Sequence, residues 1–267
     1  MRLSGFGLLR MMAAMLILAS AAQIPQLCLG DTDTKTKPEI PFAPGEKLVF
    51  ELRWAVVPAG KAVLEVMPMK TIGGSAAYHF RMTAESNSFV DLFYKVRDRI
   101  DSFVAADMSR SIHYRQKQRE GSSKRNIKVH FDWDNSTAQY SDGRKTKNAI
   151  DILPGTFDPL SVFYYSRLAE FEPNGTIKCP ISDGKKLITG SAKIVRKETI
   201  EVPGGTFETY LIEPDLKDIG GVFKKSKDAK IQLWVTADER RLPVKIASKV
   251  SVGSFVGELM TIEKKES

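Results

Sequence analysis

The chain has 267 residues with 40 Lys and Arg against 32 Asp and Glu, so its formal net charge is +8. Hydrophobic residues make up 42% and charged residues 27%, which allows a packed core and excludes a largely disordered or collagen-like chain. The two cysteines exclude a disulfide-dense scaffold, and together with only 3 histidines they disfavour a structural zinc cage.

The first 30 residues have the pattern of a secretory signal peptide. Arg2 and Arg10 supply positive charge at the start, and residues 11–22 form an uncharged apolar run. This run is too short to cross a bilayer core, which needs about 20 residues. We therefore predict a signal peptide over 1–30, and an uncleaved N-terminal anchor is the alternative.

The cleavage site decides how many cysteines the mature chain retains. Small residues permit cleavage after Gly30 or, earlier, after Ala22. Cleavage after Gly30 removes Cys28 and leaves Cys179, which we expect to be a buried residue of a strand. Cleavage after Ala22 retains Cys28, and a disulfide between the two cysteines then becomes feasible.

The mature chain is predicted to form one all-β domain. Residues 31–40 are polar, rich in Thr and Lys, and are expected to be a disordered leader. Within 41–263 apolar and polar side chains alternate, as around Leu48, Phe50 and Leu52, which is typical of half-buried strands. Further strand-like runs, separated by Gly- and Pro-containing turns, lie near 61–67, 78–84, 93–103, 110–119, 124–133, 176–181, 186–202, 206–213, 229–236, 243–250 and 254–262. We expect an antiparallel meander that curls into an open or closed barrel or a sandwich.

One hairpin can be placed in register from the sequence. Gly121-Ser122 suits a two-residue type II′ turn between the strands of 110–133. One face of the hairpin is then mostly apolar and carries the pairs Ile112–Phe131, Tyr114–Val129 and Gln116–Ile127. The other face is basic and carries the pairs His113–His130, Arg115–Lys128 and Arg119–Lys124.

One helix is predicted over about 158–170. Asp158 can cap it, Pro159 suits its first turn, and apolar residues recur at helical spacing at Leu160, Phe163, Tyr164 and Leu168. A single helix in a β-rich chain usually plugs a barrel end or covers a sheet edge.

The sequence carries none of the common catalytic or phosphate-binding motifs, and we predict no catalytic residues, no cofactor and no metal. His79 alternates outward from a strand and is expected to be solvated. His113 and His130, with Asp132 nearby, are the best metal candidates, but Arg115 and Lys128 beside them would repel a cation.

Basic residues concentrate on the outward face of the 110–133 hairpin. They are Arg110, His113, Arg115, Lys117, Arg119, Lys124, Lys128 and His130. Such a face suits anionic lipid headgroups or acidic glycans, whereas export argues against nucleic acid. The alternative is a solvated sheet edge whose charges protect it from aggregation and which needs no partner.

Two sites are predicted to be structural ion pairs. Asp98 shares the inward side of its strand with apolar neighbours, so it should need an arginine partner. Asp238 and Arg241 flank a charged turn between two strands and should close it by pairing.

Several segments together resemble one known family. They are PFAPGEKLVFELRW at 41–54, VRDRIDS at 96–102, VHFDW at 129–133, FDPLSVFYYSRL at 157–168, VPGGTFETYLIEP at 202–214 and LWVTADERRLPVKI at 233–246. Their sequence and order resemble an uncharacterised bacterial family, domain of unknown function 3108. This resemblance implies an exported, β-rich envelope protein of Gram-negative type, and it supplies no catalytic residues.

The leading functional hypothesis is a non-enzymatic periplasmic module that binds an apolar or amphipathic envelope ligand or partner. A curved sheet of this size encloses or faces an apolar cavity, and its candidate wall residues are Trp54, Phe80, Tyr94, Tyr114 and Phe131. The first alternative is a hydrolase-type enzyme that acts on envelope glycan or lipid through scattered carboxylates such as Asp98 and Asp101. The second is an outer-membrane barrel, against which the charged outward faces argue. After signal cleavage we expect no integral membrane segment.

Overall fold

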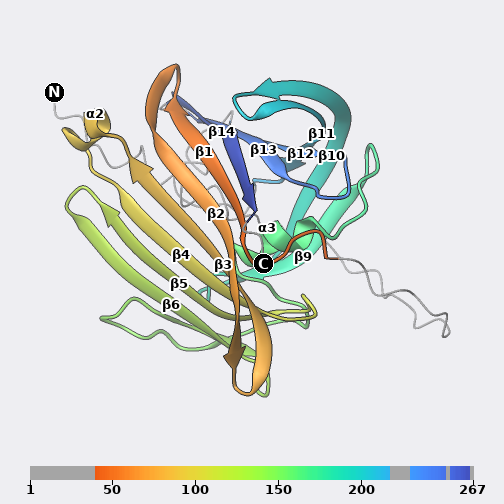
Figure 1. Cartoon of the computed structure of the whole chain (residues 1–267). Coiled ribbons are helices and arrows are strands. Elements are labelled where there is room, and N and C mark those ends of the chain that lie inside the picture. Colours follow the sequence, from red (N-terminus) through yellow and green to blue (C-terminus); the bar gives the residue numbers. More distant parts are fainter. Residues whose placement is uncertain (1–39, 217–228, 251–252, 265–267) are drawn as a thin grey trace.

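The structure, a computed structural model, describes residues 40–216, 229–250 and 253–264 (Figure 1). The predicted signal peptide, Cys28 and nearly all of the predicted leader lie outside these ranges. Fourteen strands and two short helices, α2 (Ser88–Asp91) and α3 (Ser161–Ser166), form the described chain. The strands are β1 (Glu46–Trp54), β2 (Val57–Ile72), β3 (Ser75–Ser86), β4 (Arg97–Ala105), β5 (Ser111–Glu120), β6 (Ser123–Asp132), β7 (Thr137–Ser141), β8 (Ile150–Asp151), β9 (Thr176–Ser182), β10 (Leu187–Val202), β11 (Gly205–Pro214), β12 (Lys230–Thr236), β13 (Pro243–Val250) and β14 (Gly253–Lys264).

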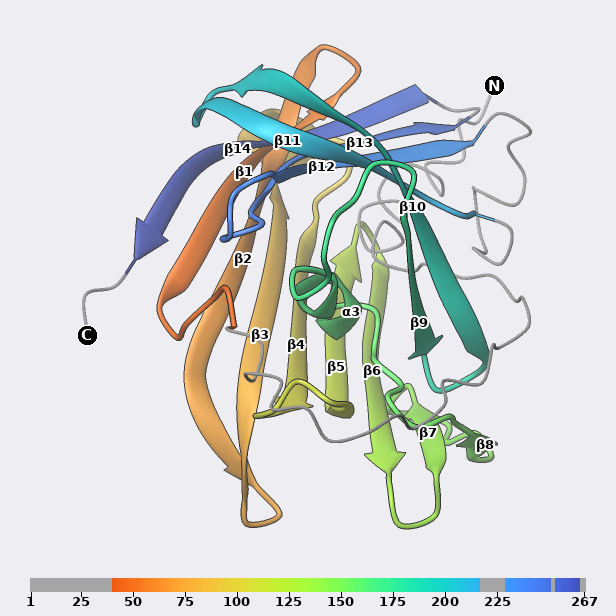
Figure 2. The ribbon, with the colours of Figure 1, turned by 90° about the vertical axis from the view of Figure 1, so that its right-hand side faces the viewer.

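All fourteen strands belong to one antiparallel sheet, which confirms the predicted all-β meander. The order across the sheet is β8-β7-β6-β5-β4-β3-β2-β1-β14-β13-β12-β11-β10-β9. The first strand therefore lies in the middle, where it pairs with both β2 and the last strand, β14. The sheet curls so that its two halves face each other with α3 between them, but its edges β8 and β9 do not pair (Figures 1 and 2).

The segment that precedes α3 links edge β9 to β5 in the other half of the sheet. The backbone N–H of Phe157 donates to Pro180 O of β9 at 2.9 Å, and Ser182 N–H donates to Phe157 O at 2.9 Å. On its other side this segment accepts a hydrogen bond from Ser111 N–H of β5 at Thr156 O, at 3.1 Å. The buried backbone of the segment is thereby satisfied, as burial requires.

Because β1 to β7 are antiparallel, the connections between them lie alternately at one end of the sheet and at the other. The β1–β2 turn, the α2 segment between β3 and β4, and the β5–β6 turn lie at one end, which we call the α2 end (Figure 1). The β2–β3, β4–β5 and β6–β7 turns lie at the opposite end. Residues far apart in the sequence therefore meet at each end.

The predicted register of the β5–β6 hairpin is confirmed. His113 pairs with His130, and the pairing continues to Glu120 and Ser123 on either side of the two-residue turn. Gly121 in this turn has a φ of 55°, a left-handed conformation that glycine adopts without steric penalty.

One pair in the predicted hairpin is wrong. Ile112 does not pair with Phe131, because the register between β4 and β5 shifts next to it, between Phe103 and Val104. Val104 and Ser111 form the next pair, and both are fully buried. Ile112 is the extra residue of this β-bulge, and a bulge re-aims the side chain that it contains.

Helix α3 is shorter than the predicted 158–170. The carboxylate of Asp158 accepts hydrogen bonds from the backbone N–H groups of Leu160 (2.9 Å) and Ser161 (3.0 Å), as a helix cap does. It also accepts the hydroxyls of Ser102 (2.6 Å) and Ser111 (2.7 Å), which ties the helix to β4 and β5. Burial raises the pKa of Asp158, although these hydrogen bonds act in the opposite direction.

Helix α3 ends at Ser166, and the next residue, Arg167, forms a buried ion pair with Glu46. The guanidinium donates to Glu46 Oε1 at 2.6 Å and to Glu46 Oε2 at 3.0 Å, and it also donates to the carbonyls of Pro41 and Arg240. After α3 the chain continues through two turn-type hydrogen bonds, from Leu168 N–H to Tyr165 O and from Ala169 N–H to Ser166 O, and Arg167 fixes it to β1 and to the β12–β13 turn.

Aromatic side chains fill the space around α3. Phe80 of β3 stacks on Tyr164 with ring centroids 3.8 Å apart, and Phe42 packs edge-on against both rings. Two small apolar cavities, of about 80 and 50 Å³, flank Phe163. Cys179 of β9 is buried as predicted, and burial raises the pKa of its thiol to about 12.

Candidate functional site

The largest concave site that we describe is a notch of about 1050 Å³ at the end opposite α2. The β4–β5 connection ends short of the β2–β3 and β6–β7 hairpins, which project beyond it on either side (Figure 2). The notch lies between these projections, and the chain around Pro154 completes its lining. Small-molecule sites have volumes of about 300–1,000 Å³, so the volume of the notch lies just above the upper limit of that range.

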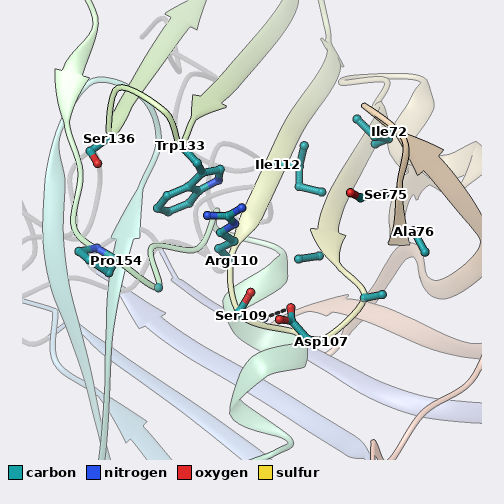
Figure 3. Close-up of a pocket in the computed structure, with 13 residues that line it drawn as sticks. Ile72, Ser75, Ala76, Asp107, Ser109, Arg110, Ile112, Trp133, Ser136 and Pro154 are labelled. Atoms are coloured by element: carbon teal, nitrogen blue, oxygen red, sulfur yellow. Dashed lines mark hydrogen bonds between the residues drawn. The ribbon is translucent and has the colours of Figure 1, made fainter.

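Arg110 and Trp133 form the centre of the notch (Figure 3). The Arg110 guanidinium carbon lies 5.0 Å from the centroid of the Trp133 ring, a cation–π contact. The indole Nε1–H donates to Ser111 O at 2.7 Å, and the ring stacks on buried Phe131 with centroids 6.3 Å apart. Trp133 is thus held from behind, and it in turn positions an exposed guanidinium.

The rest of the lining is divided between apolar and small polar groups. Ile72, which ends β2, and Ile112 contribute the apolar part, so the β-bulge brings an apolar side chain into the notch. Ser75, Ser109 and Asp107 contribute the polar part, and the Asp107 carboxylate accepts a hydrogen bond from Ser109 N–H at 3.0 Å. In the described chain no ion pair involves Arg110, so its guanidinium is available to an external anion.

This arrangement combines a cation with a flat apolar surface. A guanidinium recognises carboxylate or phosphate through paired hydrogen bonds, and an indole beside it offers a flat apolar surface. The lining contains neither histidine nor cysteine. A ligand with an anionic group next to an apolar body fits this combination.

The other basic candidates lie on the outer face of β5 and β6 and do not line the notch. Arg115, Lys117, Arg119, Lys124, Lys128 and His130 are all exposed there. His113 Nδ1 and His130 Nδ1 are 3.2 Å apart. Burial, followed by the charges of His130 and Arg115, lowers the pKa of His113. Within 40–216, 229–250 and 253–264 no group of three or more His, Cys, Asp or Glu could hold a metal ion.

The prediction that His79 is solvated is wrong. Its side chain points to the outer face but is only 5% exposed, because it stacks on Phe103 of β4 with centroids 4.4 Å apart. Its Nε2 is 2.7 Å from Asp101 Oδ1, and Arg81 and Arg99 also donate to that carboxylate. Burial alone would raise the pKa of Asp101, but the hydrogen bonds from these three residues hold it well below its usual value.

The prediction that Asp98 pairs with an arginine side chain is also wrong. Asp98 is 5% exposed on the inner face and accepts the backbone N–H of Arg119 at 2.8 Å. Its side-chain neighbours are Glu120, to which it is hydrogen-bonded, and Gln118. Burial, together with Glu120, raises the pKa of Asp98 to about 7, so the two carboxyls share a proton.

Asp98 and Asp101 cannot act as a catalytic pair. Residues three positions apart in a strand point to opposite faces of the sheet. Asp98 faces the interior with Glu120, whereas Asp101 lies on the outer face with His79. The geometry therefore rules out these two carboxylates as partners in one active site.

The predicted ion pair between Asp238 and Arg241 is wrong, because Asp238 pairs with Arg240 instead. Asp238 Oδ2 accepts from Arg240 Nη2 at 2.6 Å, and Asp238 Oδ1 accepts the hydroxyl of Thr236. The guanidinium of Arg241 instead lies over the ring of Phe171, 4.7 Å from its centroid. Arg241 has a φ of 46°, which turns its side chain away from the carboxylate.

The five predicted wall residues do not surround one cavity. Phe80, Tyr114 and Phe131 are buried in the core, Tyr94 packs against the β5–β6 turn, and Trp54 is 40% exposed and stacks on Phe255. None of them lines the notch or either small apolar cavity. The large apolar side chains that line the notch are instead Trp133, Ile72 and Ile112, which the sequence did not predict as wall residues.

A family model for proteins of unknown function, DUF3108, matches residues 49–260. The chain belongs to the DUF3108 family. The family description assigns no activity, and a search of curated proteins finds no match. Among the described residues no helix has the length and apolar character that crossing a membrane requires.

Solved structures resemble this DUF3108 protein to different degrees. A β-barrel-like protein of the domain of unknown function DUF1849 from Brucella abortus has 10% identity and a TM-score of 0.51, and the match covers 83% of this chain and 98% of that one. The hypothetical protein CT021 from Chlamydia trachomatis has 8% identity and a TM-score of 0.41, with 84% and 89% covered. The first of these supports a barrel-like fold and nothing about activity.

Proposed function

We propose that this DUF3108 protein is an exported, non-enzymatic binding module whose ligand is an amphipathic envelope molecule with an anionic group. The signal-peptide pattern of residues 1–30 supports export, and periplasmic residence follows from it in a Gram-negative cell. The observation that carries the proposal is the exposed Arg110 guanidinium held over Trp133 inside a notch of about 1050 Å³.

Two properties of the notch support this class of ligand. The anionic group would bind Arg110, and the apolar body would lie against Trp133, Ile72 and Ile112. The small apolar cavities beside Phe163, of about 80 and 50 Å³, are less suited to it, because each holds only a few carbon atoms.

Binding of anilinonaphthalene sulfonate, an aromatic fluorophore with one anionic group, tests the proposal. Arg110→Gln should weaken binding by about tenfold or more, since a hydrogen bond to a charged group contributes about 1.5–3 kcal/mol. Arg144→Gln is the matched control, because Arg144 is an exposed arginine outside the lining. Decanoate should displace the probe and decanol should not.

Equal affinity in the Arg110→Gln variant, or equal competition by decanoate and decanol, would contradict the proposal. Native mass spectrometry of protein purified from its own envelope provides a second test. The expected result is a bound anionic amphiphile that Arg110→Gln protein loses and Arg144→Gln protein keeps.

A further inference from the structure

The exposed apolar side chains of the protein gather at the α2 end. Ten large apolar residues of the described chain are exposed, and six of them belong to residues 54–57 and 89–93. Val56 is 80% exposed, Leu92 77% and Phe93 78%, and Phe93 packs edge-on against Phe89 with centroids 5.7 Å apart. Single exposed apolar residues are ordinary, but a cluster of bulky ones marks an interaction site.

The two apolar segments form one patch because hydrogen bonds join them. Asn87, which caps α2, donates from Nδ2 to Pro58 O at 2.7 Å and from its backbone N–H to Ala59 O at 2.9 Å. The α2 segment is therefore fixed beside the start of β2 (Figure 1). We call Val56, Val57, Phe89, Leu92 and Phe93 the apolar tip.

Cations lie directly beside the apolar tip. The β5–β6 turn packs against the chain that follows α2, since Gly121 N–H donates to Lys95 O at 2.8 Å. This contact brings Arg119 and Lys124, which face each other across the hairpin, next to the tip. The acidic partners at this end, Glu85 and Asp91, pair with other basic residues, and within the described chain no ion pair reaches Arg119 or Lys124.

We propose that the α2 end docks on an anionic lipid surface. Phe89, Leu92 and Phe93 would enter the boundary between headgroups and acyl chains, where aromatic and leucine side chains are favoured. Arg119 and Lys124 would lie against the anionic headgroups. Like charges opposite each other on paired strands are unfavourable, and headgroup phosphates offset this repulsion.

Charge favours a lipid surface over a second copy of the chain. A second copy carries the same cations around the same apolar tip, so association through it brings like charges together. The docking inference does not depend on a ligand in the notch, because the notch lies at the opposite end of the sheet. A docked molecule would hold its notch away from the membrane.

Vesicle flotation of the mature protein tests the inference. Vesicles of phosphatidylcholine with about one-third phosphatidylglycerol should bind the protein, and vesicles of phosphatidylcholine alone should bind it at least about tenfold less. The variant F89S/L92S/F93S should lose binding by about tenfold or more, whereas L153S/M260S, which removes exposed apolar residues elsewhere, should not.

The charge requirement has its own matched pair of variants. R119Q/K124Q should weaken binding about tenfold, and R196Q/K197Q, which removes the same charge from β10, should leave it unchanged. Trp54 lies at the same end. Brominated lipid should therefore quench part of the tryptophan fluorescence of the wild-type protein, and it should not quench the fluorescence of W54F. Arg110→Gln should keep full vesicle binding, so failure of the notch and failure of the tip are separable.

Three results would overturn the inference. One is the absence of binding to the anionic vesicles. Another is unchanged binding of the F89S/L92S/F93S variant, with circular dichroism showing that it is folded. The third is a dimer in solution that this variant abolishes, because the apolar tip would then be covered by a second copy.

Discussion

The proton shared by Asp98 and Glu120 makes the stability of the fold depend on pH, and Asp98→Asn removes that dependence. The asparagine keeps an oxygen that accepts the Arg119 N–H, and it presents an NH₂ group to the Glu120 carboxylate. It therefore imitates the protonated form of Asp98 at every pH. The substitution changes neither the size of the side chain nor its place in the core.

The expected magnitude follows from the pKa. Burial and Glu120 raise the pKa of Asp98 from 3.8 to about 7, and about three pKa units correspond to about 4 kcal/mol. Because the folded pKa is the higher one, this contribution to stability is fully present below about pH 4 and is lost as the pH rises to about 7. Asp98→Asn should therefore raise the free energy of unfolding by about 2 to 4 kcal/mol at about pH 8 and have little effect near pH 4.

Urea unfolding, followed by tryptophan fluorescence at several pH values, measures this difference. Asp101→Asn is the control on the same strand, and its effect should have the opposite sign, because hydrogen bonds hold the pKa of Asp101 well below its usual value. That variant should be less stable than wild type at about pH 8, and its deficit should shrink in acid. If Asp98→Asn destabilises the protein equally near pH 5 and pH 8, the carboxylate is ionised and paired, and the reasoning is wrong.

Three further substitutions test how the barrel is held together. Arg167→Met should lower the free energy of unfolding by about 3–5 kcal/mol in urea titrations, because it leaves the buried Glu46 carboxylate without its partner, and adding Glu46→Gln should recover part of the loss. Gly60→Ala should lower the melting temperature far more than Gly73→Ala, because a Cβ at position 60 would lie 2.0 Å from a backbone oxygen of β3, whereas nothing lies within 4 Å of one at position 73. Ser111→Ala should cost about 1–3 kcal/mol of unfolding free energy, because it removes a hydroxyl bound to the buried carboxylate at the start of α3; no loss would show that the other donors suffice.

Local signals predicted much of the fold. Strands with one buried face alternate in sequence because the pleat alternates in space, so the strands could be derived from periodicity. The short Gly- and Pro-containing turns between them indicated an antiparallel meander. The register of β5 and β6 followed from a turn of two residues, since such a turn fixes every later pair.

Features that depend on a neighbouring strand escaped prediction. Alternation placed His79 on the outer face correctly, but its burial comes from Phe103 and its hydrogen bond from Asp101, more than 20 residues away. The bulge at Ile112 likewise depends on how β5 pairs with β4. Neither can be read from the segment in which the residue stands.

The candidate site was predicted only in part. Arg110 was identified because it belongs to a dense run of basic residues, but the notch also needs Ile72 and Trp133 from two other turns. These turns meet because antiparallel strands return to the same end, and sequence spacing does not reveal which turns will adjoin. The apolar tip was missed for another reason, since α2 has four residues and a helix that short shows no periodicity.

The segment before α3 gives this barrel wall a seam. On one side β9 pairs with β10 from Ser182 to Thr176. On its other side it is joined to the first half of the sheet through the single residue Phe157, by two backbone hydrogen bonds of 2.9 Å. Separating a ladder breaks many bonds together, but opening the seam breaks few. The amides of Phe157 and Ser182 should therefore exchange with deuterium sooner than those of the β2–β3 ladder. The barrel should also open at this contact first, which would increase its diameter.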